Sequence, residues 1–195
     1  MLSCQGWQVT LPIHFVSNAG VPLVGTSDFI IDLARLDFDA PIAGIEEIRK
    51  FNPQRFEMEQ LTSILCECKE TQACAAYKQL TDDEFWVRGH MPGMPLMPGV
   101  MILEAAAQLA SYFTQKNDLL GAAMVGFGGL DNVRFRGVVT PGSKLIVMVR
   151  LDRVRRGRMI VAPFQGVVDG SLVAEGVLRG IPIPTEALNE QMSKS

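Results

Sequence analysis

Apolar residues follow a helical repeat in two segments of the chain. The longer segment, residues 98–116, places apolar residues on every side of the helix that it predicts, which is typical of a helix buried all round. Pro98 suits its first helical position, because proline lacks the amide hydrogen that would have no intrahelical partner there. A shorter amphipathic helix is predicted over residues 43–51 and ends before Pro53.

Strand-like runs account for most of the remaining sequence. Two precede the long helix and five follow it, and they span residues 61–68, 73–80, 123–127, 132–136, 144–153, 159–168 and 172–181. Asp169 and Gly170 mark a tight hairpin between the last two runs, since both residue types adopt left-handed backbone angles readily. One antiparallel sheet wrapped around one long helix is the simplest arrangement, so we expect an α+β fold.

The two ends of the chain are less regular. Residues 1–40 contain one strand-like run, residues 7–16, and several turn signals, and we expect an N-terminal extension of unknown role. We expect residues 41–183 to form one domain and residues 184–195 a disordered tail. A chain of 195 residues, 48% of them hydrophobic, can build the core of such a domain without disulfides or metals.

Charge and composition exclude several classes of protein. A net charge of −3 and a pI of about 5.4 predict neither a nucleic-acid partner nor attraction to an anionic membrane. The longest apolar stretch, residues 97–110, is interrupted by Glu104 and is too short to span a bilayer, and residues 1–28 lack a secretory signal pattern. The four cysteines show no zinc-binding spacing, so we expect reduced thiols, no metal and a soluble cytoplasmic protein.

Glu104 is the only charged residue between Gly99 and Tyr112, within the apolar helix. An ionised carboxylate is costly to bury without a partner, so its presence there requires an explanation. A functional acid is one interpretation. A side chain that reaches solvent or caps a neighbouring backbone group is the other.

His90 lies in a loop built for rigidity. Residues 88–99 contain three prolines and three glycines, which fix the chain and allow close backbone approach. A rigid loop that carries one ionisable side chain suits a functional site better than a bystander histidine. The first-turn amides of Gly99 and Val100 add donors at the positive end of the helix dipole, where a carbonyl oxygen could gain negative charge. This trio of base, acid and oxyanion donors fits proton abstraction next to a carbonyl.

The same residues resemble the 3-hydroxyacyl-(acyl-carrier-protein) dehydratases of the FabZ type, with the FabA type as a close relative. About 140 residues resemble the family, and the first 40 do not. The motif that carries the resemblance, G-H-F-P-G-x-P-x-M-P-G-V-x-x-x-E-A-x-A-Q, is matched by Gly89, His90, Pro92, Gly93, Pro95, Met97, Pro98, Gly99, Val100, Glu104, Ala105, Ala107 and Gln108.

The resemblance implies a hotdog fold and a homodimer with shared active sites, in which His90 of one subunit acts with Glu104 of the other. It also implies a substrate carried on the phosphopantetheine of acyl carrier protein, with no other cofactor, and a pathway of fatty acid or polyketide synthesis. His90 would remove the α proton, Glu104 would protonate the leaving 3-hydroxyl, and Gly99 and Val100 would bind the thioester oxygen. A trimer of dimers is a further option. Glutamate at position 104 resembles the FabZ type, so we expect dehydration without isomerisation.

Several other residues are candidates for supporting roles. Gln108 lies one turn after Glu104 and could hydrogen-bond it, or could be a structural core amide. Four arginines crowd around Gly157 and form either a docking patch for acidic acyl carrier protein or a solvated hairpin; they are Arg153, Arg155, Arg156 and Arg158. Four methionines could line an acyl tunnel or belong to the core; they are Met91, Met94, Met97 and Met101.

The sequence departs from the family at Met91, where phenylalanine is usual, and at Gln54, where many members have histidine. Neither change removes a catalytic group, and both could reshape the acyl tunnel. Two other functions remain open, because fold alone does not separate them. One is a non-catalytic hotdog protein that binds acyl thioesters, and the other is an acyl-thioester hydrolase.

Overall fold

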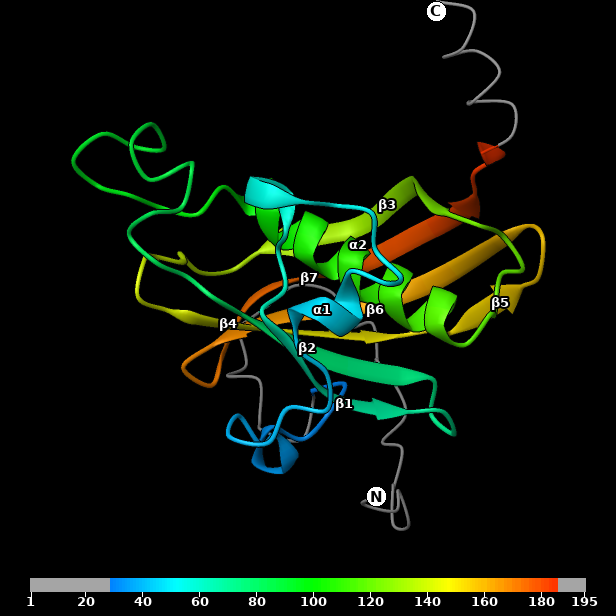
Figure 1. Ribbon diagram of the computed structural model, residues 1–195. Coiled ribbons are helices and arrows are strands. Elements are labelled where there is room, and N and C mark those ends of the chain that lie inside the picture. The colour runs from blue at the N-terminus through cyan, green and yellow to red at the C-terminus, as the bar shows by residue number, and fades with distance from the viewer. Residues whose placement is uncertain (1–28, 186–195) are drawn as a thin grey trace, which may run out of the picture.

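The central helix α2 lies in the concave face of one antiparallel sheet (Figure 1). The structure is a computed structural model that describes residues 29–185. Its sheet has the strand order β1-β2-β4-β6-β7-β3, and β5 pairs with β6 beside this path. The predicted α+β class is confirmed. The elements are α1 (Ile45–Ile48), β1 (Ser63–Cys68), β2 (Ala73–Gln79), α2 (Gly99–Lys116), β3 (Val125–Phe135), β4 (Lys144–Arg150), β5 (Arg153–Arg155), β6 (Met159–Val168) and β7 (Ser171–Pro182).

The core forms between α2 and the inward side chains of the strands. Ala105, Leu109 and Phe113 of the helix have no exposed surface, and they face strand residues such as Ile160 and Phe164. Small alanines let the helix lie close to the sheet, and the larger side chains fill the space around them. The helix is therefore held by apolar burial along most of its length.

One face of α2 is left outside the sheet, which corrects the prediction of a helix buried all round. Val100 is 65% exposed, and Glu104 and Ala107 are partly exposed. These residues are spaced four and three positions apart, so they form one stripe along the helix. Pro98 also differs slightly from its expected place, because it is the N-cap residue that precedes the first turn.

Two of the predicted strand boundaries were wrong. Residues 123–127 and 132–136 belong to one strand, β3, whose pairing with β7 is irregular at Phe127/Gly129 and at Asp131/Arg134. The strand stays continuous through these irregular pairs, although it contains glycines and an asparagine with a positive φ, Asn132. Because glycine and asparagine normally mark turns, the sequence pattern looks interrupted there. The run 144–153 is instead split, since β4 ends at Arg150 and β5 begins at Arg153.

Residues 29–40, which we call the outer-face segment, cover the side of the sheet opposite α2 (Figure 1). Ile31 and Leu36 are buried there against strand residues that include Leu65 and Met148. The amide of Ile30 also donates to Gln165 Oε1 at 2.7 Å. This part of the N-terminal extension is packed on the domain. The predicted strand over residues 7–16 and most of the predicted tail lie outside the described residues.

The outer-face segment can be tested by Ile31→Ala, which should lower the free energy of unfolding by about 2–4 kcal/mol because it leaves a cavity under a buried position. Urea unfolding followed by circular dichroism measures this change. Ala34→Ser, at an exposed position of the same segment, should stay within about 0.5 kcal/mol of the wild type. An unchanged midpoint for Ile31→Ala would mean that the segment does not stabilise the fold.

Candidate functional site

His90 is held in a defined orientation by the loop between β2 and α2. Its Nδ1 lies 2.9 Å from the carbonyl oxygen of Leu96. A carbonyl only accepts hydrogen bonds, so Nδ1 carries the proton in the neutral imidazole, and Nε2 keeps a free lone pair. The hydrogen bond therefore leaves His90 oriented as a base.

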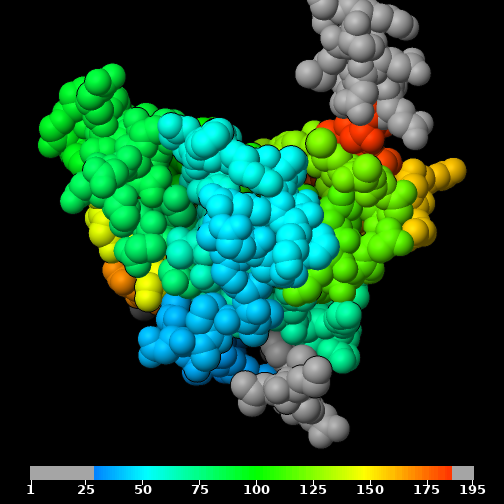
Figure 2. Space-filling model, viewed as in Figure 1, coloured from blue at the N-terminus to red at the C-terminus, as the bar shows by residue number. Residues whose placement is uncertain are grey.

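Backbone hydrogen bonds fix the loop itself, which projects from one end of the molecule (Figure 2). The His90 amide donates to the carbonyl of buried Trp86 at 2.8 Å, and the Leu96 amide donates to the carbonyl of His90 at 2.8 Å. Met97 then joins the loop to the body by donating to Val139 O at 2.7 Å. The rigidity expected from the prolines and glycines is thus accompanied by anchoring at both ends of the loop.

Glu104 is oriented by Gln108, one turn further along α2. Gln108 Nε2 donates to Glu104 Oε1 at 2.7 Å and to Met58 O at 2.6 Å, and Gln108 Oε1 accepts from the Gln60 amide at 2.9 Å. Gln108 is only 2% exposed, and these bonds satisfy both amide hydrogens and the oxygen. Gln108 is therefore both a core amide and a partner of Glu104.

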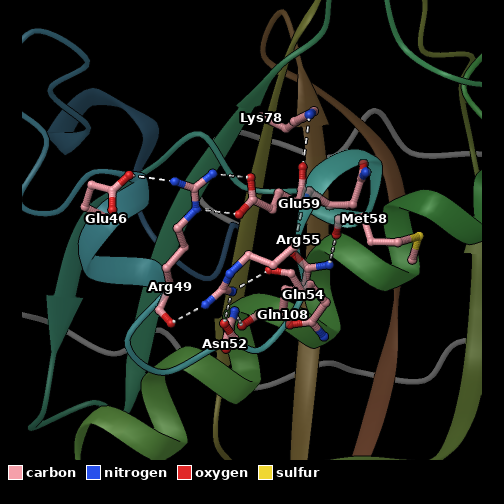
Figure 3. A network of polar contacts seen from close by, with 10 residues as sticks. Glu46, Arg49, Asn52, Gln54, Arg55, Met58, Glu59, Lys78 and Gln108 are labelled. Carbon is pink, nitrogen blue, oxygen red and sulfur yellow. Dashed lines mark hydrogen bonds and ion pairs between the residues drawn. The ribbon is translucent and has the colours of Figure 1, made fainter.

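Segment 52–60 crosses α2 and supplies the other partners of Gln108 (Figure 3). Asn52 Nδ2 donates to Gln108 O at 2.9 Å, and Arg55 Nη1 donates to Asn52 O at 2.8 Å. Arg49 forms two bonds to Glu59, at 2.6 and 2.9 Å, and thereby lowers the pKa of that carboxyl. No local signal in the sequence predicts this support, because the contacts join residues 48 to 56 positions apart.

An open pocket lies beside Glu104. Ala107 and Ser111 extend its wall along α2, Phe127 borders it from β3, and Gln54 borders it from segment 52–60. The carboxamide oxygen of Gln54 is buried and has no hydrogen-bond partner among the described residues. His90 does not line this pocket, so the structure does not bring His90 and Glu104 of one chain into one pocket.

The N-terminus of α2 presents unpaired backbone donors. Among residues 29–185, no group accepts a hydrogen bond from the amides of Gly99 and Val100. A Cβ on Gly99 would lie 2.7 Å from Cε1 of Phe135, so only glycine allows this ring to pack against the helix start. Unpaired amides at the positive end of a helix dipole suit an oxygen that gains negative charge, so the predicted oxyanion-binding role stays a prediction for these two residues.

The predicted arginine cluster is exposed at the turn between β5 and β6. Arg156 forms an ion pair with Asp118, with 2.7 Å between Nη2 and Oδ2. Within the described part of the chain, Arg153, Arg155 and Arg158 have no acidic partner within ion-pair distance. Their charge is therefore available to a partner molecule.

The methionines and cysteines have no place in the Glu104 pocket. Met97 and Met101 are buried in the core, while Met91 and Met94 are exposed in the His90 loop. Cys66, Cys68 and Cys74 are free thiols, and burial raises the pKa of Cys74. Over residues 29–185 there is no group of three or more potential metal ligands and no helix long and apolar enough to cross a membrane.

Comparison with known proteins places these residues in a family. Residues 52–177 match the model of the FabA-like domain. The chain belongs to the FabA-like family. It is 38% identical over 136 residues to the 3-hydroxyacyl-(acyl-carrier-protein) dehydratase FabZ of Polynucleobacter necessarius, covering 69% of this chain and 90% of that one. It is 34% identical over 134 residues to the FabZ of Streptococcus pneumoniae, covering 69% and 94%. The FabZ-type resemblance is confirmed.

A solved structure shares the fold. The dehydratase heterocomplex ApeI:P from Xenorhabdus doucetiae matches with a TM-score of 0.60 at 16% identity, covering 73% of this chain and 95% of that one. At this level of identity the likeness concerns the fold alone. It confirms the hotdog fold for this chain of the FabA-like family.

Gln108→Ala should lower the free energy of unfolding by about 2–4 kcal/mol, because Met58 O, the Gln60 amide and Glu104 lose a buried partner. Thermal and urea unfolding measure the loss. Gln115→Ala on the same helix removes a single bond, to Ala123 O, and should cost about 1 kcal/mol or less. Equal losses in the two variants would contradict the role given to Gln108.

Proposed function

We propose that this chain is a dehydratase that converts 3-hydroxyacyl-(acyl carrier protein) thioesters into trans-2-enoyl thioesters in fatty acid biosynthesis. The observation that carries the proposal is that the two ionisable groups of the family motif are each oriented by a second group. His90 is oriented by Leu96 O and Glu104 by Gln108. The FabZ names of the curated relatives support the same reaction.

The chemistry divides between these groups. Nε2 of His90 takes the proton from C2, and the charge that develops on the thioester oxygen is stabilised by the amides of Gly99 and Val100. Glu104 gives a proton to the 3-hydroxyl. The C3–O bond breaks, water leaves, and the C2–C3 double bond forms. The reaction uses no cofactor besides the phosphopantetheine that carries the substrate.

Each active site combines two copies of the chain. The Glu104 pocket is not lined by His90 of the same chain, which supports a site in which a second copy brings its own His90 loop to the pocket. The edge strand β3 carries exposed apolar side chains that such a partner would cover, among them Phe127 and Phe135. Val100 on α2 and Met94 in the His90 loop are also exposed apolar residues. A homodimer through this side of the molecule completes both sites.

Incubation of the protein with a 3-hydroxyacyl carrier-protein thioester should form the trans-2-enoyl product, detected as a mass loss of water. His90→Ala and Glu104→Gln should each lower kcat by about 10²–10⁴-fold, because each removes one proton transfer. Glu57→Gln, at an exposed glutamate, is the matched control and should keep wild-type activity. Absence of enoyl product at every chain length, with folding intact, would refute the dehydratase. Release of free acid would instead identify a hydrolase.

Mixing the two inactive variants tests the shared site. Random exchange makes about half of the dimers mixed, and each mixed dimer has one site with both groups, so about a quarter of the wild-type activity should return. Exchange is followed independently by native mass spectrometry. Proven exchange without recovered activity would show that the two groups act within one chain.

We propose that Arg153, Arg155 and Arg158 dock acyl carrier protein, whose surface is strongly acidic. Arg155→Glu should raise KM for a carrier-protein substrate at least about tenfold at low salt and leave KM for a pantetheine thioester unchanged. Lys69→Glu makes the same charge change in the β1–β2 turn and should alter neither value. Equal effects of the two variants would show that net charge, not this turn, governs association.

A further inference from the structure

Lys78, near the end of β2, joins the two segments that support the candidate site. Its side-chain amine lies 3.2 Å from Glu84 Oε1 and donates to Glu59 O at 3.1 Å. Figure 3 shows the bond to Glu59. Only 15% of the Lys78 side chain and 9% of the Glu84 side chain are exposed, so solvent screens this ion pair weakly. A shielded pair of opposite charges holds its partners more firmly than an exposed pair does.

Glu84 lies at the base of the His90 loop. Its carbonyl accepts from the Val87 amide at 2.9 Å. Two residues after Glu84, Trp86 O accepts from the His90 amide at 2.8 Å, and the Trp86 side chain is buried in the core. The ion pair with Lys78 therefore fixes the start of the turn that carries His90.

Glu59 belongs to segment 52–60, which supports Glu104. The next residue, Gln60, donates its amide to Gln108 Oε1 at 2.9 Å, and Gln108 Nε2 donates to Glu104 Oε1 at 2.7 Å. The Glu59 carboxylate pairs with Arg49, so Lys78 bonds the backbone of this segment and not its side chain. Lys78 thus fixes the path of the segment one residue before the contact with Gln108.

We propose that Lys78 is a positioning residue that serves both active sites of the homodimer. The inference rests on the proposed function, in which His90 of one chain acts with Glu104 of the other. Within one chain, Lys78 therefore holds the base of one site, through Glu84, and the acid of the other site, through Glu59. It does not line the Glu104 pocket, so it acts through these segments and not on the substrate. Small displacements of catalytic groups slow a reaction strongly, which makes one ammonium group that fixes two segments important for both sites.

Removal of the ammonium group should affect turnover more than binding. Lys78→Met should lower kcat at least about tenfold and change KM less than about threefold, because a displacement of about 1 Å misaligns the proton transfers. Lys50→Met is the matched control, since it removes an exposed ion pair with Glu47 and should keep the wild-type kcat. An unchanged kcat in Lys78→Met would overturn the proposal.

A double variant separates positioning from stabilisation of the fold. Lys78→Met alone leaves the shielded Glu84 carboxylate unpaired, which destabilises the protein, whereas adding Glu84→Gln removes that unpaired charge. The double variant should unfold at a higher temperature than Lys78→Met and still show the lowered kcat, because neither segment is held. Turnover is measured well below every unfolding midpoint. A double variant with wild-type kcat would show that Lys78 only stabilises the fold.

Complementation shows which sites each Lys78 serves. In a mixed dimer of His90→Ala and Glu104→Gln chains, the complete site takes Glu104 from the first chain and His90 from the second. Lys78→Met should lower the recovered activity at least about fivefold whether it is placed in the first chain or in the second. A loss from only one of the two placements would show that Lys78 serves a single site and would contradict the proposal.

Hydrogen exchange tests the connection without turnover and so separates this inference from the proposed function. Amides of residues 52–60 and 84–97 should both exchange at least about fivefold faster in Lys78→Met, measured against the amides of β7, and Lys50→Met should change neither. If no thioester is dehydrated, the proposed function fails, and faster exchange in both segments still supports the connection through Lys78. Faster exchange in one segment only, or in neither, overturns it.

Discussion

The hydrogen bonds of Gln108 connect three parts of the molecule at one buried point. A carboxamide that is 2% exposed needs partners for both amide hydrogens and its oxygen, since an unpaired buried polar group costs about 1–3 kcal/mol. Those partners are Met58, Gln60 and Glu104. Satisfying the core amide therefore fixes the loop that crosses α2 and selects the rotamer of the acid. The bonds that satisfy the buried amide thus also orient the acid of the proposed reaction.

His90 is oriented by the same principle on a different part of the chain. The carbonyl of Leu96 selects the tautomer, and the backbone bonds around Trp86 fix the loop. A pocket beside Glu104 that lacks His90 and an edge strand with exposed Phe127 and Phe135 make one chain structurally incomplete. In the proposed homodimer each chain orients one of the two ionisable groups of a site, and the partner chain brings the other group to it.

Much of the fold could be predicted from the sequence because the pattern around α2 is strong. The helix and the antiparallel strands were within reach, and the family motif points to His90 and Glu104 as a catalytic pair, which stays a prediction. The exposed stripe at Val100 and Glu104 was not, because periodicity cannot reveal which face of an all-apolar helix remains uncovered. The length of β3 was missed because its irregular pairing around Gly129 and Asn132 interrupts the strand pattern. The outer-face segment was missed because its docking depends on contacts distant in sequence.

The exposed stripe of α2 has a composition that is unusual for a surface helix. A surface helix normally carries polar residues on its outer side, yet this stripe holds Val100 and Ala107 around a single acid. An acyl chain is itself apolar, so a wall that binds it needs the composition of a protein core. The wall of a substrate pocket and the core of a protein therefore cannot be told apart by their hydrophobic pattern. Glu104, which lies between Val100 and Ala107, is the one charged residue of the stripe, and in the proposed reaction it faces the only substrate group that must be protonated.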